Sequence, residues 1–171
     1  YWRANRKHLN IEAIRDSLLA TSGELDARLL GRAAQLWGDD YTRRRAIYGY
    51  IDRFNLDPTL RTFDFPAPMQ TQPARDESIV APQALFTMNA PFVIDQAVAV
   101  TKASQFNDCA SDEKRTVALF ELILQRRPNL AETTRTTKFV QLQKRFFKDP
   151  KKKGIDSPWP IAAQALYMSN E

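Results

Sequence analysis

Apolar residues recur at helical spacing in the first part of the chain. Ile14 and Leu18 lie four residues apart, so both fall on one face of a helix. This pattern predicts a helix over residues 10–22. A second, shorter helix is expected to follow Gly23 and to end near residue 30.

The same spacing returns after residue 81 and predicts five further helices. Their expected ranges are 82–90, 92–105, 112–126, 130–147 and 158–169. Ser111, followed by two acidic residues, marks the start of the third of these helices, because acidic side chains favour the first turn. Asn129 and Glu132 have the three-residue spacing of a capping box at the start of the fourth.

The helical rhythm fails between these two regions. Residues 46–51 are rich in β-forming side chains and predict one short strand or extended segment. Residues 55–81 contain several prolines and the motif Phe63-Asp-Phe-Pro66, which predicts a long irregular connection. The predicted fold is therefore mainly α: a helical domain with a long irregular connection rich in Pro and aromatic residues, and at most one or two short strands.

Composition narrows the class of protein. The chain has 171 residues, of which 43% are hydrophobic and 26% charged, and both fractions are typical of a globular domain. We expect residues 1–171 to form a single domain that is a fragment of a larger multidomain protein. Because no apolar run approaches the roughly 18 residues that a membrane helix needs, no transmembrane segment is expected.

The charge of the chain is mildly basic. The formal net charge is +5, and acidic residues are interspersed among the basic ones. A continuous basic stripe is therefore not predicted, and nucleic acid is not expected as a partner. A basic surface that binds a polyanion such as sulfated glycan is kept as an alternative. The run Lys151 to Lys153 is typical of a solvated loop, and its role is left open.

The cysteine and histidine counts limit cofactor chemistry. The chain has one cysteine, Cys109, and one histidine, His8. Covalent c-type haem needs a Cys-x-x-Cys-His motif, and structural zinc needs about four ligands, so no cofactor and no metal are predicted for this chain. Acidic neighbours disfavour a catalytic thiolate at Cys109, whose role is left open. His8 is expected to have a surface or packing role and not a catalytic one.

Three carboxylates are the candidates for acid–base chemistry. Glu12 and Asp16 share one face of the first predicted helix, and Asp64 lies in the irregular connection. A pair of carboxylates is what a glycoside hydrolase requires. Arg15 adjoins Asp16, however, and an ion-paired carboxylate is a poor general acid, so structural ion pairing is the favoured interpretation.

Several stretches together resemble, in the same order, the C-terminal part of one family. These stretches are Trp2–Leu9, Glu12–Gly23 with Leu25-Asp26, Arg43–Tyr48, Phe63–Pro66, Pro82–Phe92 and Trp159–Glu171. The chain is similar to the PSD-type planctomycete domain, also called domain of unknown function 1553. The lone Cys109 and the basic run Lys151 to Lys153 depart from the family pattern.

The resemblance implies a module of large secreted or envelope-associated planctomycete proteins. Such proteins often carry a cytochrome c-like module, so any haem is expected on that module and not on this chain. The family supplies no catalytic residues to carry over. We therefore expect a non-catalytic scaffold or interaction module in an extracytoplasmic location. Its expected partners are other domains of the parent chain, a cytochrome c-like module or a polysaccharide. The alternative function is that this chain forms part of a polysaccharide-active enzyme.

The polar residues within the family-like motifs lie beside strongly apolar ones. A polar group brought next to a core must be hydrogen-bonded, because an unpaired one costs several kcal/mol. We therefore predict a structural polar network in which Arg15 or Arg44 reaches Asp64 or nearby loop carbonyls and pins the Pro-rich connection onto the helices. Its predicted members are Arg15, Asp16, Arg44, Tyr48, Asp64, Gln83 and Asn89.

Overall fold

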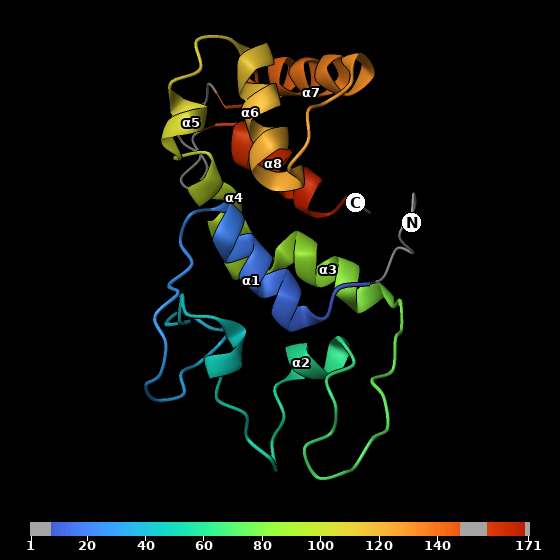
Figure 1. Ribbon diagram of the computed structural model, residues 1–171. Coiled ribbons are helices and arrows are strands. Elements are labelled where there is room, and N and C mark those ends of the chain that lie inside the picture. The colour runs from blue at the N-terminus through green and yellow to red at the C-terminus, as the bar shows by residue number, and fades with distance from the viewer. Residues whose placement is uncertain (1–7, 148–156, 170–171) are drawn as a thin grey trace, which may run out of the picture. The chain divides into compact units, whose positions relative to one another are not determined.

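The computed structural model describes residues 8–147 and 157–169 and divides into two compact units (Figure 1). Unit 1 consists of Tyr1–Ser17 and Leu25–Phe86, and unit 2 consists of Leu18–Glu24 and Thr87–Glu171. The structure is 51% helical and 3% strand, which confirms the prediction of a mainly α fold. The expectation of a single domain stays a prediction.

Unit 1 combines short helices with long irregular segments. It contains the first part of α1 (Ile11–Thr21), the 3-10 helix η1 (Ala46–Tyr48), α2 (Pro58–Thr62) and the first part of α3 (Ala81–Asn89). The α2 helix begins where Asp57 accepts a hydrogen bond from the Thr59 N–H and Pro58 occupies the first helical position. The buried core of unit 1 consists of Ile11, Leu36, Ala46, Leu56, Leu60 and Phe63.

Unit 2 is a cluster of helices. It contains α4 (Pro91–Val100), α5 (Ser104–Asn107), α6 (Asp112–Leu124), α7 (Leu130–Gln143) and α8 (Trp159–Tyr167). The α8 helix packs against α4, α6 and α7. Its Trp159 meets Phe106 edge to face, with the ring centroids 5.2 Å apart. The buried core consists of Ala97, Val100, Phe106, Leu119, Val140, Trp159, Ala162 and Ala163.

The caps predicted for α6 and α7 are confirmed. Ser111 accepts a hydrogen bond from the Lys114 N–H at 3.2 Å and so caps α6. Asn129 accepts one from the Glu132 N–H at 2.9 Å, and the Glu132 carboxylate accepts one from the Asn129 N–H at 2.7 Å, which completes the capping box. Capping chemistry within a few residues is the part of the fold that the sequence predicts best.

One local prediction is wrong, and a second holds only in part. The expected helix from Gly23 to residue 30 does not form, because Leu29 and Leu30 are 75% and 82% exposed and find no core to cover. The short strand or extended segment expected at 46–51 is present only in part: η1 occupies residues 46–48, and Gly49 is extended and forms a bridge with Ala34. Within the described residues, strand-like pairing is limited to the isolated bridges Asp26↔Arg44 and Ala34↔Gly49.

Two other predicted elements are modified. The irregular connection over 55–81 contains the short helix α2, which its Asp57-Pro58 start accounts for. The predicted helix over 92–105 is interrupted, because α4 ends at Val100 and α5 begins at Ser104. The run Lys151 to Lys153 lies outside the described residues.

The carboxylate of Glu132 makes the α7 cap sensitive to acid. Hydrogen bonds from Arg126 and from the Asn129 N–H lower the pKa of Glu132 from its usual 4.5 to about 2. Its stabilising contribution is therefore fully present above about pH 4.5 and is lost as the pH falls towards 2. Glu132→Gln keeps an oxygen that can accept the capping hydrogen bond but removes the ion pair. We expect its urea midpoint to lie below the parent's at pH 6 and to converge on it as the pH falls towards 2. A gap that stays constant over this range contradicts the assignment.

Candidate functional site

The buried guanidinium of Arg15 connects α1 to the segment that follows it in unit 1. Arg15 is 0% exposed. Its Nε donates to the Leu36 carbonyl at 3.3 Å, its Nη1 donates to the Arg44 carbonyl at 2.8 Å, and its Nη2 donates to the Thr42 carbonyl. The guanidinium carbon also lies 5.8 Å from the centre of the Trp37 ring. One side chain therefore satisfies three backbone acceptors between residues 36 and 44.

Asp16 holds the far end of the same segment. Its Oδ1 accepts a hydrogen bond from the Ala46 N–H at 2.7 Å, and its Oδ2 lies 3.6 Å from Nε of Arg45. Burial lowers the pKa of Arg15, while the Asp16 carboxylate at 3.6 Å opposes that shift. These two neighbouring residues of α1 thus fix the backbone from Leu36 to Ala46.

A second arginine organises the loop at residues 28–32. Arg44 donates from Nη1 to the Arg32 carbonyl at 3.1 Å and from Nη2 to the Leu30 carbonyl. Its guanidinium carbon lies 3.9 Å from the centre of the Tyr48 ring, and the Tyr48 hydroxyl accepts a hydrogen bond from the Leu30 N–H at 3.0 Å. Leu30 is held at φ 65, a left-handed conformation that costs a bulky residue energy.

Gly31 lets this loop close on Arg44. Its φ is 106, and a Cβ added there would lie 3.2 Å from Nη1 of Arg44. A side chain at this position would therefore be strained in its backbone and crowded against the guanidinium. The tight turn presents Leu29 and Leu30 outward.

Asp64 and Gln83 meet at Ser78, within the Pro-rich connection. Asp64 accepts hydrogen bonds from the Ser78 N–H at 2.8 Å and from the Ser78 hydroxyl at 2.9 Å. Nε2 of Gln83 donates to the carbonyls of Ser78 at 3.2 Å and Thr62 at 3.1 Å. Gln83 is only 8% exposed, so these contacts tie the connection to α3 from inside unit 1.

The ion pair of Glu12 and Arg75 adds a third attachment to α1. Arg75 donates from Nη1 and Nη2 to the two carboxylate oxygens at 2.9 and 2.6 Å. Its guanidinium carbon lies 5.0 Å from the centre of the Phe65 ring. Burial raises the pKa of Glu12, but the hydrogen bonds and the charge of Arg75 outweigh it, so the pKa is lowered.

The predicted network members fall into two groups and one separate position. Arg15, Asp16, Arg44 and Tyr48 surround the segment at 28–48, whereas Asp64 and Gln83 share Ser78. Asn89 is exposed at the last residue of α3.

The expected partners need correction. Arg15 and Arg44 bind carbonyls between residues 28 and 44, and Asp64 binds Ser78. The Pro-rich connection is instead tied to α1 by Glu12 and Arg75. Sequence reasoning missed Arg75, because no spacing pattern relates residues that are 63 positions apart.

A shallow cavity of about 380 Å³ lies at the tip of unit 1. Its wall comes from the turn at 53–56, from α2 and from the turn at 65–69. Two of its apolar residues are strongly exposed, Phe54 at 89% and Met69 at 60%. The lining consists of Arg53, Phe54, Leu56, Arg61, Phe65, Ala67, Pro68 and Met69 and includes neither a carboxylate nor a histidine.

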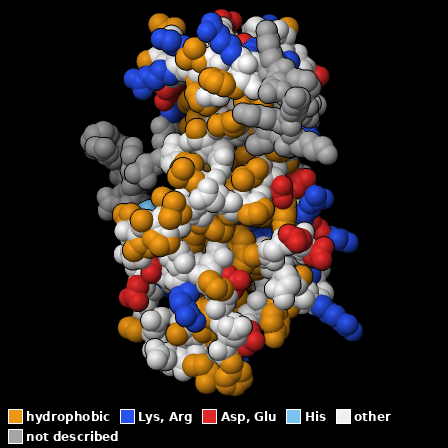
Figure 2. Space-filling view, turned by 180° about the vertical axis from the view of Figure 1, so that it is seen from behind, with side chains coloured by type: hydrophobic (Ala, Val, Ile, Leu, Met, Phe, Trp, Pro, Cys, Tyr) orange, Lys and Arg blue, Asp and Glu red, His pale blue; other side chains and the backbone are white. Residues whose placement is uncertain are grey.

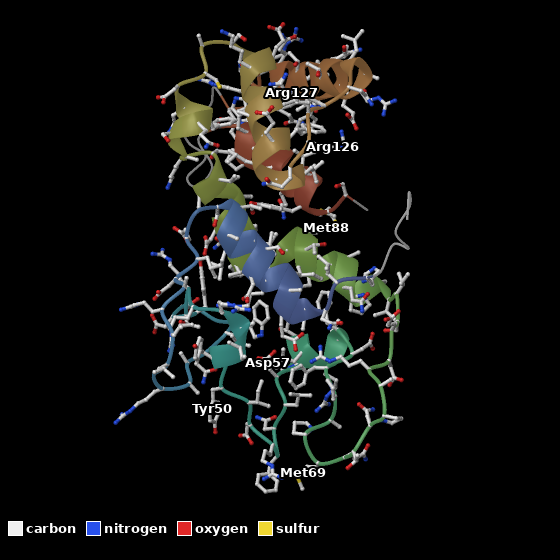
Figure 3. The ribbon with its side chains drawn as sticks, in the orientation of Figure 1. Tyr50, Asp57, Met69, Met88, Arg126 and Arg127 are labelled. Atoms are coloured by element: carbon white, nitrogen blue, oxygen red, sulfur yellow. The ribbon has the colours of Figure 1, made fainter. Side chains whose placement is uncertain are left out.

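The pictures show this apolar tip directly. Figure 2 shows hydrophobic side chains gathered at the lower end of unit 1. Figure 3 places Met69 at the same end, away from α1 and α3. Exposed apolar patches are typical of surfaces that contact a protein, a membrane or a ligand.

The cysteine and histidine lie outside these contacts. Cys109 is half-buried and directs its thiol to the Gln105 carbonyl at 3.2 Å, and His8 is exposed. Within residues 8–147 and 157–169, no group of three or more His, Cys, Asp or Glu side chains is arranged to hold a metal ion. None of the helices in those ranges is both long and apolar enough to cross a membrane.

Arg15 donates hydrogen bonds to the carbonyls of Leu36, Thr42 and Arg44, and we call this set of contacts the Arg15 clamp. Because the clamp is buried, it predicts a large loss of stability on substitution. Arg15→Met leaves three carbonyls without their donor, and we expect it to lower the free energy of unfolding by about 3–5 kcal/mol. Arg15→Lys should lose a smaller part, because an ammonium cannot span the three acceptors. The matched control is Arg44→Met, which removes the more exposed contacts of Arg44 with the carbonyls of Arg32 and Leu30. We expect it to lower the free energy of unfolding by about 1–2 kcal/mol. Urea denaturation of the three variants measures this order, and equal losses for Arg15→Met and Arg44→Met would refute it.

Comparison with known proteins identifies a family but no relative of known activity. Searches of curated proteins and of solved structures each found no match. A family model described as a protein of unknown function (DUF1553) matches residues 1–140. This range includes the hydrogen bonds and the ion pair described above for unit 1. The chain therefore belongs to the DUF1553 family.

Proposed function

We propose that this chain is a non-catalytic scaffold or interaction module of an extracytoplasmic multidomain protein. One observation carries the proposal: each of the three carboxylates that are candidates for acid–base catalysis holds part of the chain itself. Glu12 binds Arg75, Asp16 binds the Ala46 N–H, and Asp64 binds Ser78.

The geometry of these carboxylates disfavours glycoside chemistry. A general acid needs a raised pKa and a free path to the leaving group, whereas the pKa of Glu12 is lowered. Asp16 and Asp64 direct oxygens at backbone N–H groups of their own chain. The three side chains also attach three different segments and do not converge on the cavity, whose lining contains none of them.

The clamps instead hold exposed apolar side chains in fixed positions. Leu29 and Leu30 are 75% and 82% exposed and lie in the segment that Arg44 binds. Ile47 is 76% exposed and follows Ala46, whose N–H donates to Asp16. A surface that is ordered before binding loses less conformational entropy when a partner covers it. Irregular loops held in this way suit an interaction module.

The family resemblance suggests what such a module accompanies. Its partners would be other domains of the parent chain, including a cytochrome c-like module that carries its own haem. An extracytoplasmic location is proposed on the same resemblance. Polysaccharide hydrolysis by this chain is the competing function.

Substitution of Asp64 separates the two functions. Asp64 has a φ of 56, which Asn tolerates better than Ala does. If Asp64 is structural, Asp64→Ala should lower the free energy of unfolding by about 1–3 kcal/mol, and Asp64→Asn should lower it less. Urea denaturation measures both. A variant that unfolds like the parent chain but loses glycan hydrolysis by the intact protein would make Asp64 catalytic and refute the scaffold proposal.

A further inference from the structure

We propose that the cavity at the tip of unit 1 binds a protein segment in which an apolar side chain lies next to carboxylate groups. This inference rests on the proposed interaction function and names the chemistry of the partner. The volume of about 380 Å³ falls at the lower end of the range for ligand pockets. The lining consists of six apolar residues and two arginines, Arg53 and Arg61.

The apolar part of the cavity calls for a partner larger than the cavity. Leu56, 8% exposed, and the half-buried Phe65 supply its floor. Phe54, at 89% exposed, and Met69 stand at the rim. A small molecule that filled the cavity would leave most of the Phe54 ring in water. A protein segment can place one side chain in the cavity and cover the exposed ring as well.

The charge beside the cavity calls for carboxylates. Arg53 and Arg61 are exposed, and the described part of the chain gives neither guanidinium a hydrogen bond or an ion pair. The neighbouring acids are engaged elsewhere: Asp52 accepts from the Phe54 N–H at 2.9 Å, and Asp57 accepts from the Thr59 N–H at 2.7 Å. Carboxylates on a partner complement two such guanidiniums in charge and in hydrogen-bonding geometry.

The walls of the cavity are ordered without a partner. The Asp52 turn fixes the backbone of Phe54, and a turn with a 3.0 Å hydrogen bond from the Gln70 N–H to the Ala67 carbonyl fixes the opposite wall. Arg75, held by Glu12, packs against Phe65. Binding therefore requires little rearrangement of the site.

The same lining disfavours a glycan. A neutral sugar has hydroxyl groups that donate as well as accept hydrogen bonds, and the lining side chains offer the donors of two arginines but no hydroxyl, amide or carboxylate group to accept. A sulfated glycan would use the two arginines but would leave Phe54 and Met69 without a role. Peptide binding requires both features, and this difference provides the test.

Peptide selection with matched variants tests the proposal. A random twelve-residue phage library is selected on the full 171-residue chain, and synthetic versions of enriched peptides are titrated by fluorescence anisotropy. We expect enriched peptides to combine Phe or Leu with Asp or Glu. Phe54→Ser and the double variant Arg53→Gln/Arg61→Gln should each raise Kd at least tenfold. The control Arg32→Gln/Lys102→Gln makes the same change in net charge away from the cavity lining and should change Kd less than twofold.

Other outcomes overturn the proposal. It fails if no peptide is enriched, if enriched peptides lack acidic residues, or if the control weakens binding as much as the cavity variants do. It also fails if a heparin oligosaccharide, used as a second probe, depends on Arg53 and Arg61 and competes with the peptides while Phe54→Ser has no effect on either. None of these results bears on the Asp64 substitutions, so a failure here leaves the scaffold proposal to its own test.

Discussion

The burial of one guanidinium, that of Arg15, is the constraint on which unit 1 depends. Removing a cation from water is costly unless its hydrogen-bonding groups are satisfied, and Arg15 is 0% exposed. The backbone carbonyls of Leu36, Thr42 and Arg44 satisfy it, with Asp16 nearby. The protein thus uses an unfavourable burial to fix a long segment that has little regular structure of its own.

Side-chain hydrogen bonds, and not a β-sheet, hold the backbone of unit 1 after α1. The backbone around residues 24–50 pairs through two isolated bridges in the described structure, so a β ladder does not determine its path. Arg15, Arg44 and Asp16 instead supply donors and acceptors to its backbone groups. Arginine suits this role because its planar group carries five N–H donors. An irregular surface held in this way can be rigid enough to recognise a partner.

The accuracy of the sequence predictions depended on how local each interaction is. The α7 capping box could be predicted because Asn129 and Glu132 are three positions apart. The importance of Arg15 was also predictable, since a charge beside Ile14 on an apolar helix face needs partners. The partners of Arg15 could not be predicted, because they are backbone carbonyls, which every residue has whatever its side chain. The helix predicted near Leu29 is absent for a related reason. Apolar spacing produces a stable helix only where a core buries the apolar face, and Leu29 is exposed.

Native-state hydrogen exchange of the parent and Arg15→Lys tests most directly whether Arg15 orders this surface. The reporters are the amides of Ala34, Thr42 and Tyr50, which donate to the carbonyls of Tyr48, Gln35 and Ala34. The account predicts that all three lose protection together in the variant, while the amides of α6 keep theirs. Unchanged protection at these three amides would contradict it, because the segment would then be ordered without the arginine clamp.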